Sequence, residues 1–245
     1  MNTRWRTIAT TMGLAVFASV AMPASSFAQA GGAMNPELQQ RIAALKQSAA
    51  TNQQKLRRYQ WTEVQQLTLK GETKPQQEFM CQYGPDGQVQ KFPMGEQQQP
   101  SGGRLKQRIA EKKKAEMKDY LSDVKSLLAE YLPPNPAKIQ QAAQSGNVAL
   151  SKEPAAGLVV LTFTNYAQPG DQMAVSFDPT AKKIVTINVN TYMGEVKDKV
   201  SLDVSFSTLP DGTNYAEKTV LDLTAKQMVI TTLNTNYHLF GQPGM

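Results

Sequence analysis

The spacing of apolar residues predicts that the folded part of the chain begins with a helix. From Pro36 to about Arg57, apolar residues recur every three or four positions on one side, and Gln, Lys and Arg occupy the other. The sequence Asn35-Pro36-Glu37 provides a capping side chain, a first-turn proline and an early acid. The apolar stripe consists of Leu38, Ile42, Leu45, Ala49 and Leu56.

After this helix the period of the pattern changes to two, which is typical of β-strands. A strand is expected from Tyr59 to Lys70, a second around Phe79–Tyr83 and a third from Gln88 to Phe92. The turn Gly84-Pro85-Asp86-Gly87 joins the last two, so the three strands predict an antiparallel meander. One side of the first strand carries Tyr59, Trp61, Leu67 and Leu69, interrupted by Glu63 and Gln65.

A polar segment from Pro93 to Gly103 reads as a loop, and the helical period then returns. A long helix is expected from Arg104 to about Tyr131, where Pro133-Pro134 cannot continue it, and a short one follows from Pro136 to Gln144. The apolar face of the long helix consists of Leu105, Ile109, Met117, Leu121, Val124 and Leu128.

The remainder of the chain is a succession of alternating segments separated by turns, which predicts antiparallel sheet with one wet face. Strands and helices are segregated along the chain, so the fold class is α+β: a large curved antiparallel sheet with helices packed on one face, in a single domain from 31 to 245. The expected strands are Val148–Lys152, Leu158–Tyr166, Gln172–Phe177, Lys183–Tyr192, Val200–Phe206, Tyr215–Leu223 and Gln227–Leu233.

The first thirty residues have the pattern of a secretory signal peptide. Arg4 and Arg6 form a basic start, an uncharged apolar run extends from Ile8 to Met22, and small residues at Ala28 and Ala30 form an Ala-x-Ala cleavage site. We therefore expect cleavage after Ala30 and a protein that resides in a bacterial periplasm.

Composition excludes several classes of site. The formal net charge of +6 is too small and dispersed for a nucleic-acid binder. Cys81 is the only cysteine and His238 the only histidine, so a catalytic pair or a metal site has few residues available, and we expect no metal and no cofactor. His238 is expected just after the last strand, near a mobile chain end. Cys81 is expected to be an inert core thiol, with an intermolecular disulfide as the alternative.

The order of elements resembles that of the periplasmic lipoprotein-carrier superfamily, the LolA/LolB-like proteins. The resemblance extends over roughly Pro36 to Leu239 and includes Tyr59-x-Trp61 at the opening of the first strand, with the turns Gly84-Pro85-Asp86-Gly87 and Leu209-Pro210-Asp211-Gly212. It implies an incomplete β-barrel whose concave face is covered by helices. It also implies a cavity between sheet and helices for acyl chains of lipids or lipoproteins.

The apolar residues of the strands and the long helix are compatible with either a filled core or the lining of such a cavity. Glu63 and Gln65 on the same strand side favour a cavity, because a dry core penalises polar groups unless they are paired. The leading hypothesis is a binding or carrier protein for an apolar or amphiphilic ligand, without covalent chemistry. Its expected ligand-binding residues are Trp61, Leu67, Leu69, Phe79, Met117, Leu121, Val124 and Leu128.

A second hypothesis is a non-carrier interaction protein on the same scaffold, either a periplasmic sensor or a component of an envelope complex. Its contact surface would be the basic start of the long helix, where Lys112, Lys113 and Lys114 suit an anionic membrane surface or an acidic envelope protein. An enzyme that works with carboxylates alone is a third hypothesis.

The signal-peptide interpretation predicts that a protein secreted by a bacterial host begins at Gly31. Intact-mass analysis of periplasmic protein should give the mass of residues 31–245. Replacing Ala28 by Arg should block cleavage and leave the precursor in the membrane fraction, because the peptidase requires a small residue there. Periplasmic protein that retains residues 1–30 would contradict the interpretation.

Overall fold

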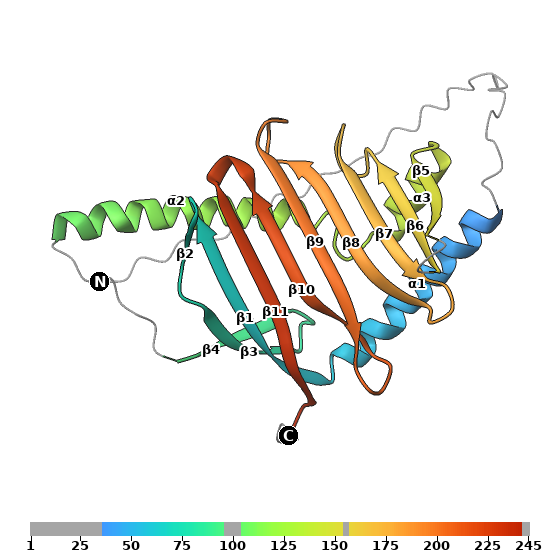
Figure 1. The fold of residues 1–245 in the computed structure, drawn as a ribbon, viewed down its shortest axis with the longest axis horizontal. Helices are drawn as coiled ribbons and strands as arrows, with labels where there is room; N and C mark the ends of the chain where they lie inside the picture. Colours follow the sequence, from blue (N-terminus) through green and yellow to red (C-terminus); the bar gives the residue numbers. More distant parts are fainter. Residues whose placement is uncertain (1–35, 96–103, 154–156, 242–245) are drawn as a thin grey trace, which may run out of the picture. The chain divides into compact units, whose positions relative to one another are not determined.

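The computed structural model describes residues 36–95, 104–153 and 157–241, and within these ranges one antiparallel sheet carries α-helices packed on one of its faces (Figure 1). The helices are α1 (Pro36–Leu56), α2 (Arg104–Leu128), α3 (Pro136–Gln144) and a 3-10 turn, η1 (Thr224–Lys226). The strands are β1 (Tyr59–Leu69), β2 (Glu72–Thr73), β3 (Gln77–Tyr83), β4 (Val89–Met94), β5 (Val148–Glu153), β6 (Leu158–Thr164), β7 (Gln172–Asp178), β8 (Lys183–Tyr192), β9 (Lys199–Thr208), β10 (Asn214–Leu223) and β11 (Met228–Leu239).

The strand order is β4-β3-β1-β11-β10-β9-β8-β7-β6-β5, with β2 paired to β1 outside this path. The sheet is open, with edges at β4 and β5, and it curves as it crosses from one edge to the other (Figure 1). Neighbouring strands along this order follow each other in the chain except at two junctions. The short strand β2 intervenes between β1 and β3, and β1 pairs antiparallel with β11 from the other end of the chain. The α+β class and the curved antiparallel sheet expected from the sequence are therefore confirmed.

The core lies between the helices and the strands from β6 to β9. Alternate residues of these strands point to one face, and Phe163, Met173 and Val175 there are 0 % exposed. Ile139 of α3 is 3 % exposed in the same cluster, and Ile42 of α1 packs against it. An apolar stripe at helical spacing thus meets an apolar sheet face at strand spacing, which excludes water from this end of the interior.

A buried polar network fastens the segment after α2 to the hairpin between β6 and β7. The Asp171 carboxylate accepts backbone N–H groups from Tyr166, Ala167 and Gln168 at 2.5–2.8 Å. The Tyr131 hydroxyl, fully buried, donates to the same carboxylate at 2.5 Å. Burial, and then this bond to Asp171, raises the pKa of Tyr131, so the phenol stays protonated and remains a donor.

Element boundaries expected from the sequence agree with the structure within a few residues in most of the described chain, with three differences. The last strand continues to Leu239, so the expectation that His238 follows it is wrong: His238 lies within β11 and pairs with Gln60 of β1. Strand β4 continues through Pro93 to Met94, and the two-residue strand β2 carried no period that could reveal it.

The expected signal peptide, residues 1–30, lies outside the described residues. In the part of the chain that the structure describes, no helix has a stretch long and apolar enough to cross a bilayer.

The Tyr131–Asp171 bond predicts a stability cost for Tyr131→Phe of about 1–2 kcal/mol, because a buried carboxylate oxygen loses a charged hydrogen bond. Urea unfolding followed by circular dichroism measures it. Tyr192→Phe is the matched control, since the Tyr192 hydroxyl donates to the Pro169 carbonyl at an exposed site. Equal costs for the two variants would contradict the prediction, because the buried bond would then contribute no more to stability than the exposed one.

Candidate functional site

The C-terminal half of α2 lies on the sheet where β1, β10 and β11 run side by side. Val124, 1 % exposed, is buried there among Val200, Leu223 and Met228, which are 0–1 % exposed. Around these four, further apolar residues from α2 and the strands are only partly buried. We call this set the α2 cluster. It includes six of the eight residues that the sequence predicted to bind a ligand: Leu67, Leu69, Met117, Leu121, Val124 and Leu128.

The α2 cluster is packed less completely than the core beneath α1 and α3. In that core thirteen described residues are buried and eleven more are partly buried against them. In the α2 cluster four are buried and ten are partly buried, so most of its apolar side chains keep some access to solvent. Partly accessible apolar side chains of this kind are compatible with a binding site for an apolar ligand as well as with the rim of a small core.

The two remaining predicted residues, Trp61 and Phe79, lie elsewhere. Trp61 is six residues before Leu67 on β1, about 20 Å along the strand at roughly 3.3 Å per residue. Its ring stacks on Tyr237 at 5.4 Å and 9°, and contacts Tyr83 at 5.5 Å. Its indole N–H donates to the Asn234 side chain at 3.1 Å. Trp61 therefore belongs to an aromatic group of its own, and Phe79 pairs with Glu63 across the β1–β3 ladder.

The polar residues that interrupt β1 have partners in the structure. The Glu63 carboxylate, on a residue only 5 % exposed, accepts from Lys91 Nζ at 2.5 Å and from Gln65 Nε2 at 2.7 Å. Lys91 reaches it from β4, two strands away, and is itself 40 % exposed. Because Glu63 and Gln65 satisfy each other, their position on β1 does not by itself require a cavity, contrary to the sequence argument.

Cys81 lies beside this ion pair and is 0 % exposed. Its thiol is 4.0 Å from Glu63 Oε2. Burial, and then the negative charge of Glu63, raises its pKa to about 11, while Lys91 opposes the shift. A buried thiol with a raised pKa is a poor nucleophile, so this environment does not favour chemistry at Cys81.

A contact that the sequence did not reveal attaches the middle of α2 to the loop between β8 and β9. The Tyr120 hydroxyl donates to Asp198 Oδ1 at 3.0 Å, and Lys226 Nζ lies 4.6 Å from the centre of the Tyr120 ring. Burial, then the bond to Asp198, raises the pKa of Tyr120 to about 12. The phenol thus remains a donor, and it fixes the middle of α2 near η1 and the loop after β8.

The remaining expected site residues lie at the start of α2 and near the end of β11. Lys112, Lys113 and Lys114 lie within α2, but their side chains fall outside the described part of the structure. His238 Nδ1 lies 3.0 Å from the carbonyl of Asn236, on the same strand. The described residues contain no group of three or more His, Cys, Asp or Glu side chains suited to hold a metal ion.

Three comparisons place the chain relative to known proteins. No family model matches it. No curated protein matches it. Among solved structures it is similar to a DUF1329 family protein from Desulfovibrio piger, with 10 % sequence identity and a TM-score of 0.42, over 84 % of this chain and 95 % of that one.

The environment of Cys81 predicts that the native protein resists alkylation. With a pKa of about 11, only about 0.1 % of the thiol is thiolate at pH 8, and the side chain is inaccessible. Iodoacetamide should label native protein at least a hundredfold more slowly than protein in urea, as followed by mass spectrometry. Labelling of folded protein at the rate of a free cysteine would contradict this placement.

Proposed function

We propose that the protein is an exported binding or carrier protein that holds the apolar part of a lipid or other amphiphile beneath α2, without covalent chemistry. The observation that carries the proposal is the α2 cluster, where side chains directed inward by both the sheet and the helix are mostly only partly buried. An acyl chain placed among them would complete their burial.

The energy of such binding would come from removing hydrocarbon from water. Each methylene buried contributes about 0.8 kcal/mol, so at least about ten must be buried to supply the roughly 8 kcal/mol of micromolar affinity, and more to offset the cost of association. The cluster contains Met117, Met193 and Met228. Methionine is flexible and polarisable, and it adapts to ligands of varied shape. These residues therefore favour a class of apolar ligands over one particular molecule.

The two anchors of the α2 region suit a lid over this surface. Tyr120 is tied to Asp198 near the middle of the helix, and Tyr131 is tied to Asp171 just after its end. Between them, Leu121, Val124 and Leu128 contact the sheet without a hydrogen bond from their side chains. A ligand can thus separate this face from the sheet slightly while the polar contacts keep the helix attached. Residues 1–30 support an extracytoplasmic place for this binding.

The proposal predicts that filling the α2 cluster weakens ligand binding without unfolding the protein. Leu121→Trp places a larger apolar side chain among partly buried residues, and Ile139→Trp places it in the dry core, where Ile139 is 3 % exposed. We expect Leu121→Trp to weaken binding of cis-parinaric acid at least tenfold with little loss of stability. Ile139→Trp should cost about 1–3 kcal/mol, because overpacking strains a filled core.

Fluorescence titration measures the affinity and urea unfolding the stability, and native mass spectrometry of periplasmic protein identifies any lipid carried along. Wild-type protein that neither binds the probe nor carries a lipid would refute the proposal. It would also be refuted if Leu121→Trp destabilised the fold as much as Ile139→Trp, since the α2 cluster would then be solid.

A further inference from the structure

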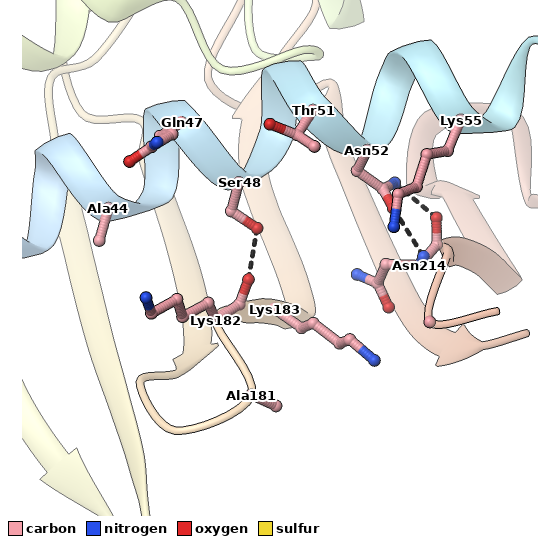
Figure 2. Close-up of a pocket in the computed structure, with 11 residues that line it drawn as sticks. Ala44, Gln47, Ser48, Thr51, Asn52, Lys55, Ala181, Lys182, Lys183 and Asn214 are labelled. Atoms are coloured by element: carbon pink, nitrogen blue, oxygen red, sulfur yellow. Dashed lines mark hydrogen bonds between the residues drawn. The ribbon is translucent and has the colours of Figure 1, made fainter. Parts of the chain in front are cut away.

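A polar groove of about 320 Å³ lies between α1 and two hairpin ends, at residues that take no part in the α2 cluster (Figure 2). One wall is the polar side of α1, and the other is formed by the β7–β8 turn and the end of the β9–β10 turn. It is lined by Ala44, Gln47, Ser48, Thr51, Asn52, Lys55, Ala181, Lys182, Lys183, Gly212 and Asn214.

Hydrogen bonds from α1 hold both hairpin ends in place. The Asn52 side chain donates to the Asn214 carbonyl and accepts from the Asn214 N–H, each at 2.6 Å. The Asn214 side chain donates to the carbonyl of Ile184 at 2.8 Å, and the Ser48 hydroxyl donates to the carbonyl of Lys182. Figure 2 shows the Ser48 and Asn52 contacts crossing from the helix to the opposite wall. The groove is therefore preorganised before any ligand enters.

The charge of the groove lining is positive. It contains Lys55, Lys182 and Lys183 and no Asp or Glu. Among the described residues none of these lysines forms an ion pair within 4 Å, and Lys183 donates only to the Thr208 hydroxyl at 3.3 Å.

The nearest acids along the chain are occupied with turn backbone. Asp178 accepts from the N–H groups of Thr180 and Ala181, and Asp211 accepts from the N–H of Thr213. Lys55 lies close enough to Asp211 for its charge to act on that carboxylate. Lys182 and Lys183 form no ion pair with a described carboxylate, so their ammonium groups, beside a concave site with fixed walls, attract an anion.

We propose that this groove binds a phosphate monoester, either a free small molecule or the headgroup of an anionic lipid. Lysine ammonium groups are point charges that suit phosphate oxygens, and the two charges of Lys182 and Lys183 match a dianion. The Gln47 amide and the Thr51 hydroxyl, which bond to no other described residue, supply further donors at the groove wall. This site is independent of the apolar site beneath α2, and its ligand is recognised by charge.

Calorimetric titration with glycerol 1-phosphate, against sodium chloride at equal ionic strength, tests the free molecule. Flotation with phosphatidic acid vesicles, against pure phosphatidylcholine vesicles, tests the headgroup. We expect wild-type binding to be saturable with at least one probe and to weaken at least tenfold in the double variant Lys55→Gln/Lys183→Gln. Lys125→Gln, on the exposed side of α2, is the matched control and should bind as wild type.

Lys182→Asn provides a variant that leaves the turn intact. Lys182 has a φ of 54°, a left-handed conformation that Asn tolerates better than Lys, so the substitution removes the charge without straining the backbone. We expect weakened binding with unchanged or raised stability. No saturable binding of either probe, or an equal loss in Lys125→Gln, would overturn the proposal. Binding of the free molecule alone or of vesicles alone would support it and identify the source of the phosphate.

Discussion

The pairing of β1 with β11 is the interaction on which the rest of the structure depends. It joins the N-terminal meander of β1, β3 and β4 to the C-terminal run of hairpins, and it extends from Tyr59–Leu239 to Leu69–Met228 with one irregularity. The α2 cluster needs this junction, because Leu67 and Leu69 come from β1 whereas Met228 and Ile230 come from β11. A helix that crosses two strands of such different origin gains its apolar contact only when those strands are hydrogen-bonded neighbours.

The local pattern of apolar residues predicted most of the helices and strands but not the contacts between them. The alternation in β1 and the helical spacing in α2 were enough to predict both elements and six residues that meet between them. Trp61 has the same alternation on the same strand, yet it belongs to an aromatic group with Tyr83 and Tyr237. Periodicity assigns a residue to a face of the sheet and does not give its position across that face. That position depends on where α2 crosses, which is a long-range property.

Charged and hydrogen-bonding partners were the least predictable part. Glu63 was recognisable in the sequence as a carboxylate on an apolar strand side, which requires a partner. The partner, Lys91, lies on β4, and only the strand order brings it across Cys81 to Glu63. The groove beside α1 is a similar case. Lys182 ends the β7–β8 turn and Lys183 begins β8, in a hairpin that looked ordinary in the sequence. The groove exists because Ser48 and Asn52 hold distant hairpins against the helix.

The late arrival of β11 has a consequence for how the chain folds. The indole of Trp61 donates to Asn234, a residue 173 positions further along the chain. The second edge of β1 therefore stays uncovered until nearly all of the protein has been synthesised. Long-range pairing of this kind slows folding, and an uncovered strand edge invites pairing with other nascent chains. The charged side chain of Glu63 and the amide of Gln65 lower the tendency of this edge to pair with other chains until β11 has been synthesised. Glu63 and Gln65, which need polar partners in the folded protein, thus also protect β1 from pairing with other chains before β11 covers it.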